Sequence, residues 1–163
     1  MRSPDPNVDV EYVRPEAEFA RFFEIEHHGQ VRRAALMLGE VTVAEDVVHD
    51  AFAAVWQRWR VLNDPGSYLN RCVLNGCRDA VSGRARSRRR FERLIASHRE
   101  GTEPVEVLAD VLADLPFKQR CAVVLHYYGG LTNAEIAEAM QCSLGSVGPW
   151  IQRGKAQLRK ELT

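Results

Sequence analysis

The stretch from Pro65 to Arg93 constrains this 163-residue chain more than any other part of it. Written as a helix from Ser67, it divides into two faces at a period of 3.6 residues. One face is apolar or small and holds Leu69, Cys72, Val73, Gly76 and Ala80. The opposite face is polar and holds Arg71, Asn75, Arg78, Ser82 and Arg86. The pattern predicts a helix that packs against a core on one side only.

The polar face of this stretch runs into a dense group of arginines. Residues 71–93 contain eight Arg against Asp79 and Glu92, a local charge of +6 in a chain whose formal net charge is +0. Arginine presents a planar fork of donors that suits phosphates and base edges. A solvated basic surface is the alternative interpretation, and the clean separation of the two faces favours a nucleic-acid contact over it.

Composition narrows the class of protein. A hydrophobic content of 45% supports a core, and 27% charged residues argue against wholesale disorder. The chain has no apolar run long enough to cross a bilayer, and its first twelve residues lack the apolar stretch of a signal peptide. We therefore expect a cytoplasmic protein without membrane insertion. The four Cys form no CxxC pair and the five His show no ligand spacing, so we expect reduced thiols and no metal or other cofactor.

The distribution of charge indicates two modules. Residues 100–116 carry five acids and no Lys or Arg, whereas residues 117–163 carry six Lys or Arg and three Glu. This segregation predicts two modules and a linker. With helical periodicity in both modules, the predicted fold is an all-α protein of two small helical domains joined by a flexible acidic linker. The predicted parts are a disordered tail at 1–15, a first domain at 16–90, a linker at 91–106 and a second domain at 107–163.

Two helices are predicted ahead of the arginine-rich one. An apolar stripe over 16–38 ends at Gly39. The next stripe is the most regular in the chain and places both of its Trp in the core; it comprises Ala44, Val47, Val48, Ala51, Phe52, Val55, Trp56 and Trp59. Asp46 and Asp50 lie one turn apart on the opposite face, which fits either a solvated surface or a docking site for a basic partner. Ser67 is the candidate N-cap of the arginine-rich helix.

The second module is predicted to hold a helix-turn-helix. An apolar stripe over 107–115 precedes Pro116, which opens a helix that Gly129 and Gly130 close. Thr132 and Glu135 have the spacing of a capping box for the next short helix. A turn over 141–143 leads to a basic terminal helix, which is the layout of a helix-turn-helix.

Together these segments resemble the two-domain extracytoplasmic-function (ECF) group of bacterial RNA polymerase sigma factors. The D-x-x-Q-D-x-F-x-x-x-W pattern of sigma domain 2 is matched from Asp46 to Trp56, with His49 in place of Gln. The following P-x-x-(W/Y)-L-x-R-x-x-x-N-x-x-x-D pattern is matched from Pro65 to Asp79. In domain 4, the matched residues are Leu115, Pro116, Arg120, Gly130, Thr132, Glu135, Ile136, Ala137, Ser143, Gly145, Ser146, Val147 and Arg153.

The resemblance implies a sigma factor that binds core RNA polymerase and directs promoter recognition and melting, without catalysing a reaction itself. It implies docking on the clamp helices of the largest subunit through Asp46, His49, Asp50, Phe52 and Gln57. It implies that the −10 element is melted and that one of its bases is flipped out. The residues implied to contact this element are Asn63, Asp64, Tyr68, Arg71, Asn75, Arg78, Arg84, Arg86, Arg88 and Arg89. It assigns the −35 element to Arg120, Thr132, Ser146, Gln152, Arg153 and Lys155.

The chain departs from the family after Ser146 and Val147. Gly148, Pro149 and Trp150 stand where the family usually places cations and a small polar residue, so −35 reading is expected to be unusual or weak. If the last helix starts after Ser146, Pro149 falls in its first turn, where no backbone hydrogen bond is lost. If the helix starts after Ser143, Pro149 is internal and should kink the helix, which costs about 3 kcal/mol of helix stability. Three roles are open for Trp150: it caps the domain core, contacts a thymine methyl group or faces a protein partner.

Two other functions compete with the sigma-factor prediction. A stand-alone helix-turn-helix regulator would bind duplex operators as a dimer, without polymerase. An enzyme is disfavoured because the sequence shows no phosphate loop, no supported nucleophile and no convincing pair of catalytic carboxylates.

Further expected partners are promoter DNA, the flap of the second-largest subunit and an anti-sigma factor. Only four residues follow Arg159, so a separate protein is expected to provide the control by clamping the two domains.

Overall fold

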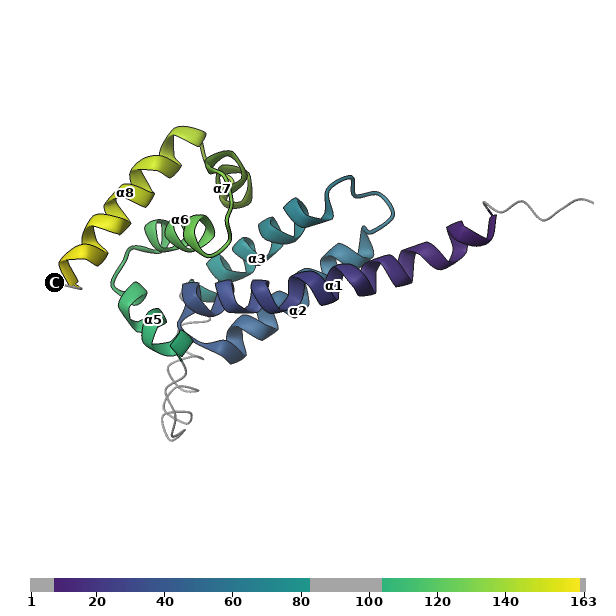
Figure 1. The fold of residues 1–163 in the computed structure, drawn as a ribbon, viewed down its shortest axis with the longest axis horizontal. Helices are drawn as coiled ribbons and strands as arrows, with labels where there is room; N and C mark the ends of the chain where they lie inside the picture. Colours follow the sequence, from purple (N-terminus) through teal and green to yellow (C-terminus); the bar gives the residue numbers. More distant parts are fainter. Residues whose placement is uncertain (1–7, 83–103, 162–163) are drawn as a thin grey trace, which may run out of the picture.

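The computed structural model describes residues 8–82 and 104–161 of the chain. Within those ranges it is helical and contains no strand, so the predicted all-α class is confirmed (Figure 1). The helices are α1 (Val8–Leu38), α2 (Val41–Gln57), α3 (Pro65–Val81), α5 (Pro104–Ala113), α6 (Phe117–Tyr127), α7 (Asn133–Met140) and α8 (Leu144–Glu161).

Helix α1 is 31 residues long and starts at Val8, eight residues before the start that periodicity predicts. Pro15 lies inside it. A proline inside a helix removes one backbone hydrogen bond, but it does not end a helix that tertiary packing stabilises further along. The predicted stop is confirmed, because Gly39 takes the left-handed conformation (φ 80°) and its amide donates to the Ala35 carbonyl at 2.8 Å.

Aromatic rings join α1 to α2. The Phe19 ring packs edge-on against the rings of Phe52 and Trp59, with centroids 6.3 and 5.3 Å apart. Trp56 also contacts Phe19, at 5.0 Å between centroids, but 43% of its surface is exposed. The prediction that both Trp belong to the core is therefore wrong for Trp56. It lies at the edge of the apolar stripe and contacts α1 through Phe19.

Helix α3 lies so close to α2 that only a glycine fits at the contact. A Cβ atom built on Gly76 would lie 2.6 Å from Cγ1 of Val47. A buried polar contact also ties α3 to α1, because the Gln30 amide donates to the Asn70 side-chain oxygen at 2.7 Å. Gln30 is 2% exposed, so this bond satisfies a donor that burial has removed from water.

The predicted helix-turn-helix is present in α7 and α8. Both bonds of the capping box are made: the Glu135 amide donates to Thr132 Oγ1 at 3.2 Å, and the Thr132 amide donates to Glu135 Oε1 at 3.1 Å. Gln141 makes the turn with a φ of 54°. Helix α8 then packs on α6 through Gly154, whose built Cβ would lie 2.7 Å from Cγ2 of Val123.

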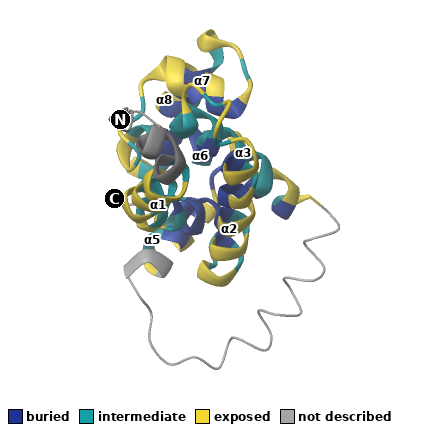
Figure 2. Cartoon of the chain, turned by 90° about the vertical axis from the view of Figure 1, so that its right-hand side faces the viewer, coloured by how far each residue is buried: buried dark blue, intermediate teal, exposed yellow. Residues whose placement is uncertain are grey.

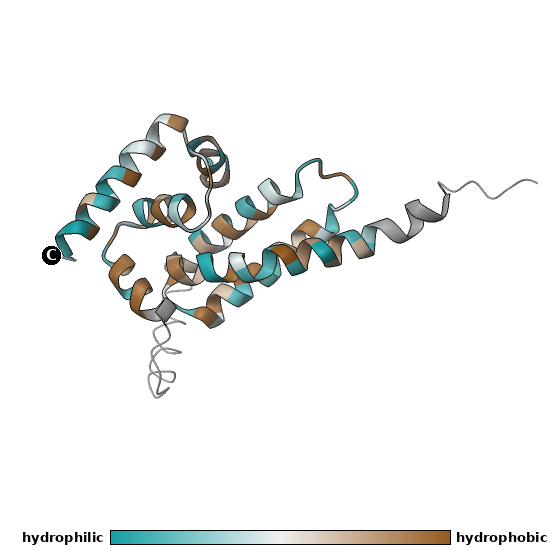
Figure 3. Cartoon of the chain, viewed as in Figure 1, coloured by the Kyte–Doolittle hydropathy of each residue, from teal (hydrophilic) through white to brown (hydrophobic). Residues whose placement is uncertain are grey.

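Helix α8 begins at Leu144, directly after Ser143, so Pro149 lies inside it. The alternative start after Ser146 is wrong. Pro149 lacks the amide that would pair with the carbonyl of Gly145, four residues earlier. Gly145 and Pro149 are both exposed, so water can hydrate that carbonyl and the helix continues. The C-terminal turns of α8 are hydrophilic (Figure 3).

Helices α1–α3 form the first half of the molecule and α5–α8 form the second half. Their buried residues belong to one continuous hydrophobic core, in which α1 packs against α5 and α6, and α3 packs against α7. Figure 2 shows the buried parts of these helices where the helices lie against one another. Two helical modules were predicted, but their direct packing was not.

Replacing Gly76 with Ala should destabilise the protein. Helix propensity alone would favour Ala by about 0.5–1 kcal/mol, but the new methyl group would overlap Val47 of α2. Because overpacking typically costs about 1–3 kcal/mol, we expect a net loss of up to about 2.5 kcal/mol in the free energy of unfolding, measured by urea denaturation. Gly145→Ala in α8 is the control, since its Cβ meets nothing within 4 Å and should leave stability unchanged or raised. Equal stabilisation by both substitutions would contradict the close α2–α3 contact.

Candidate nucleic-acid interface

The loop before α3 is ordered by Asp64. Its Oδ2 accepts from Ser67 Oγ at 2.6 Å and its Oδ1 accepts from the Ser67 amide at 3.1 Å, with Pro65 as the first helical residue. Asp64 is therefore the N-cap, and the prediction that Ser67 fills that position is wrong. These two bonds from Ser67, the hydroxyl first, lower the pKa of Asp64. The preceding Asn63 is exposed, so the predicted −10 loop presents polar groups to solvent.

Helix α3 has more buried surface than its sequence pattern predicts. Leu74 and Cys77 are 3% and 0% exposed, in addition to Leu69, Val73 and Ala80 of the predicted stripe. The reason is that α3 packs against α7 as well as against α2. Of the predicted −10 contacts, Arg71, Asn75 and Tyr68 are half-buried. Arg58, which no spacing signal identified, places its guanidinium 5.5 Å from the Tyr68 ring centroid.

Arg78 of α3 is engaged within the molecule. Its guanidinium donates to the carbonyl of Met140, the last residue of α7, at 3.1 Å. A cation at a helix C-terminus satisfies a carbonyl that has no partner inside the helix. The remaining predicted −10 contacts, at Arg84, Arg86, Arg88 and Arg89, lie outside the described residues.

The predicted docking face lies on α2. Asp46, His49, Asp50 and Gln57 are exposed on it. Phe52 is 3% exposed and packs among the aromatic rings between α1 and α2, so its assignment as a docking residue is wrong. Position 52 belongs to the buried stripe, and a docking partner cannot reach it. His49 stacks on His27 of α1, with an interplanar angle of 18° and 3.3 Å between the two Nε2 atoms.

The predicted −35 residues discussed here lie in two places: on α8, and at Thr132, which caps α7. Gln152 and Arg153 are exposed on α8, and Ser146 and Lys155 are half-buried nearby in sequence. Ser146 Oγ is 2.6 Å from Ser143 Oγ. The Thr132 hydroxyl oxygen is already engaged in the capping box, so its place in the structure is explained by helix capping.

Arg120, which is predicted to contact the −35 element, makes structural contacts in this arrangement. One guanidinium nitrogen donates to the Met37 carbonyl at 2.7 Å. The other donates to the Leu115 and Ala113 carbonyls at 2.9 and 3.2 Å. Burial lowers the pKa of Arg120. The side chain thus joins the end of α1 to the end of α5.

Trp150 belongs to the edge of the protein core. It is half-buried against the hydrophobic cluster, and Lys118 Nζ lies 5.7 Å from its ring centroid. Packing at the edge of the core, which is one of the three roles predicted for Trp150, is therefore present. Among the residues that the structure describes, no three His, Cys, Asp or Glu side chains are grouped so that they could hold a metal ion.

The fold and the exposed surfaces define a helical DNA-binding protein with a helix-turn-helix at its C-terminal end. Comparison with known families gives two matches: residues 25–88 match Sigma-70 region 2, and residues 106–158 match Sigma-70, region 4. Together they cover more than half of the chain. The protein belongs to the sigma-70 family, in its ECF group, whose members bind RNA polymerase for promoter-directed transcription initiation.

Proteins that align with most of this chain are also RNA polymerase sigma factors. The chain is 28% identical over 152 residues to an RNA polymerase sigma-E factor of Streptomyces coelicolor, covering 89% of this chain and 86% of that protein. It is 27% identical over 146 residues to the ECF RNA polymerase sigma factor SigL of Mycobacterium tuberculosis, covering 81% and 82% of the two chains.

Two solved structures share the fold. CnrH, solved in complex with the cytosolic domain of CnrY, aligns with a TM-score of 0.68 at 24% identity, covering 90% of this chain and 88% of CnrH. The sigma factor RpoE of Bartonella quintana, solved with the anti-sigma factor NepR, aligns with a TM-score of 0.67 at 17% identity, covering 89% and 96%. Both alignments therefore extend over the first and the second half.

Replacing Asp64 with Ala should remove the N-cap of α3 and lower the free energy of unfolding by about 1 kcal/mol. For the wild type, the Asp64 contribution is fully present above the ordinary Asp pKa and is lost as the pH falls through the lowered pKa of the folded state. Urea denaturation at neutral pH and at acidic pH should therefore show the two proteins converging in stability as acid is added. Asp79→Ala, an exposed position near the C-terminus of the same helix, is the control and should show no such loss. A constant difference across that pH range would contradict the capping role.

Proposed function

We propose that three surfaces of this sigma factor divide its work: the exposed face of α2 docks on core polymerase, α3 with its preceding loop reads the −10 element, and α8 contacts the −35 element. The observation that carries this division is the exposure of Asp46, His49 and Asp50 on α2, away from the exposed Gln152 and Arg153 of α8. An acidic surface and a basic surface on separate helices suit a protein partner and DNA, respectively.

The docking surface on α2 fits a cationic partner. Asp46 and Asp50 are like charges one helical turn apart, an arrangement that costs about 0.2–0.5 kcal/mol in an isolated helix. A basic partner surface removes that repulsion and gains electrostatic complementarity. The clamp helices of the largest polymerase subunit are the proposed partner for this surface, and the flap of the second-largest subunit is the proposed partner of the second half.

The −10 element is assigned to Asn63, Tyr68, Arg71, Asn75 and Arg78. An amide, an aromatic ring and guanidinium groups are the side chains that hold an unstacked base and its phosphates. Capturing a base from DNA that is already melted needs less free energy than extracting it from a duplex. In this proposal, the protein first docks on polymerase and then binds the melted DNA.

The −35 element is assigned to a reduced set of contacts on α8. Trp150 is held at the core edge beside Lys118, and Gly148 and Pro149 contribute no charge to the helix. Fewer cations release fewer counterions on binding, so the affinity for duplex DNA is lower and less dependent on salt. Promoter selectivity therefore rests more on α3 than on α8.

The proposed role includes no catalytic step, since specificity arises from binding alone. No described helix combines the length and the apolar content that crossing a bilayer requires. We place the protein in the cytoplasm, where its polymerase and DNA partners are found. Because its fold is shared by sigma factors solved with inhibitory partners, an anti-sigma factor is the proposed control of its activity.

The decisive experiment is promoter-dependent transcription with purified components. The full chain is mixed with core polymerase and candidate promoter DNA, and run-off transcripts and complex formation are measured. We expect association with core and transcripts that depend on both the chain and the promoter. Absence of association with core, or tight unaided binding to duplex operators, would instead support a stand-alone helix-turn-helix regulator.

Reversing charge on the docking surface should weaken core binding. Asp46→Arg and Asp50→Arg should each raise the Kd for core polymerase by at least about tenfold, because cation meets cation at the interface. Glu138→Arg, at an exposed position of α7, changes the charge equally and is the matched control. Fluorescence anisotropy of the labelled chain gives the Kd, and circular dichroism checks the fold. An intact fold with unchanged affinity in both α2 variants would place the docking surface elsewhere.

A further inference from the structure

Two histidines from different helices bring their ring nitrogens together at the surface of the first half. Nε2 of His27 on α1 lies 3.3 Å from Nε2 of His49 on α2, and the two ring planes are inclined by 18°. His27 is half-buried and His49 is exposed, so solvent reaches the pair. The two positions are 22 residues apart in the sequence, so no short ligand spacing identifies them.

The distance between these two nitrogens fits a shared metal ion. Hydrogen bonds from an N–H donor are most often about 2.9–3.0 Å long, so 3.3 Å is long for a direct bond between the rings. Two nitrogens that each lie about 2.0–2.1 Å from one tetrahedral ion are about 3.3–3.4 Å apart. Imidazole is a preferred ligand of Zn²⁺, Cu²⁺ and Ni²⁺. One such ion can therefore bind both rings while the two helices keep their separation.

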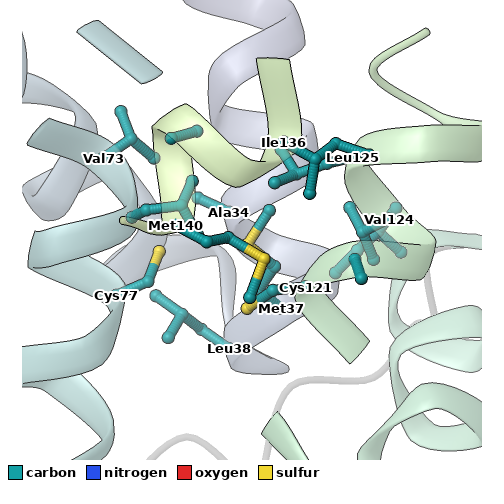
Figure 4. Close-up of a cluster of buried hydrophobic side chains, with 14 of the residues drawn as sticks. Ala34, Met37, Leu38, Val73, Cys77, Cys121, Val124, Leu125, Ile136 and Met140 are labelled. Carbon is teal, nitrogen blue, oxygen red and sulfur yellow. The ribbon is translucent and has the colours of Figure 1, made fainter. Parts of the chain in front are cut away.

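The position of His27 is fixed by packing before any ion binds. Its ring lies 4.6 Å from the Phe23 ring and 6.1 Å from the Phe52 ring of α2, measured between centroids. Further along α1, Ala34 and Met37 belong to a buried hydrophobic cluster (Figure 4). Because packing already holds α1 in place, binding an ion orders little else, and ligands that are ordered in advance bind with a smaller loss of entropy.

The charges around the histidine pair favour a cation. Glu24 lies three residues before His27, and Glu45 and Asp46 lie four and three residues before His49, so each carboxylate shares a helix face with a histidine. All three carboxylates are exposed, and no Lys or Arg lies three or four residues from either histidine. Among the described residues no third ligand completes the group, so water fills the remaining coordination positions. Nearby carboxylates can accept hydrogen bonds from those waters.

We propose that His27 and His49 form a surface site for one divalent transition-metal ion, with Zn²⁺ as the probe, and that the bound ion joins α1 to α2. Structural zinc sites use four protein ligands, whereas this site supplies two and leaves the rest to water. The protein therefore folds without the ion and binds it reversibly. The site itself is independent of the docking and promoter assignments.

An ion at this site changes the charge of the proposed docking surface. His49 lies between Asp46 and Asp50 in the sequence of α2, and both carboxylates are exposed. A divalent cation beside them offsets their negative charge, so a cationic partner loses electrostatic complementarity. This consequence rests on the proposed function: the metal ion lowers the affinity of the protein for core polymerase.

Calorimetric titration of Zn²⁺ into the full chain tests the site. The chain is prepared free of metal and without a histidine tag, in a buffer that does not bind metal, and we expect one ion per chain. His27→Gln and His49→Gln each remove a ligand and should raise the Kd for Zn²⁺ at least about tenfold. His28→Gln removes the adjacent exposed histidine, about 100° further around α1, and should change the Kd less than about twofold.

Two results of this titration would overturn the site. One is the absence of Zn²⁺ binding by the wild type. The other is a Kd for Zn²⁺ that is unchanged in both His27→Gln and His49→Gln, because binding would then belong to other side chains such as the half-buried Cys72 and Cys142. Circular dichroism of each variant checks that the helices are retained.

Urea denaturation tests whether the ion joins the two helices. Only the folded chain brings the two histidines together, so Zn²⁺ should stabilise the folded state by mass action. The urea midpoint should rise with the Zn²⁺ concentration in the wild type and in His28→Gln, and it should stay constant in His27→Gln. An unchanged midpoint in a wild type that binds one ion would contradict the proposed connection between α1 and α2.

Fluorescence anisotropy with core polymerase tests the effect on docking. Saturating Zn²⁺ should raise the Kd of the labelled wild type for core at least about tenfold, and that of His27→Gln less than about twofold. His27 lies on α1, so this variant leaves the docking residues of α2 in place. An equal effect of Zn²⁺ on both proteins would overturn the effect on docking. Failure to bind core without Zn²⁺ would refute the proposed function and leave the titration result standing.

Discussion

The end of α1 is the element on which the rest of the structure depends. Five consecutive residues, 34–38, are all buried, at 5% exposure or less. A helix buried on every side must be surrounded, and here α2, α3, α5 and α6 all pack against α1. Arg120 then satisfies the Met37 carbonyl at this end. The same turn of helix therefore carries the core of the first half and its contact with the second.

This central packing changes how the candidate site is understood. In the sequence pattern, Arg78 and Arg120 are cations available to DNA, but in the structure they bond to carbonyls at helix ends in the opposite half. A side chain with five donors can serve either role, because helix C-termini and phosphates both present acceptor oxygens with negative partial or full charge.

The individual site predictions succeeded where a side chain's environment is local. The Thr132–Glu135 capping box and the Gly39 stop were predicted because each depends on residues within one turn. Phe52 was assigned to docking from its motif, although its own buried stripe placed it inside. The N-cap of α3 was placed at Ser67 because both Asp64 and Ser67 are good caps; the bonds from Ser67 to Asp64 decide between them.

By itself, the sequence determined the helices, their apolar faces, the helix-turn-helix and the family, because periodicity, caps and motif spacing are encoded within short segments. It did not determine that the two halves share a core. Hydrophobic periodicity reports that a helix buries a face, but it does not name the element that covers it. The continuous apolar run at 34–38 was the available signal that α1 is covered on every side. Only the tertiary structure could supply the second side of α3 and the partners of Arg78 and Arg120, since those contacts join residues 62 and 83 positions apart.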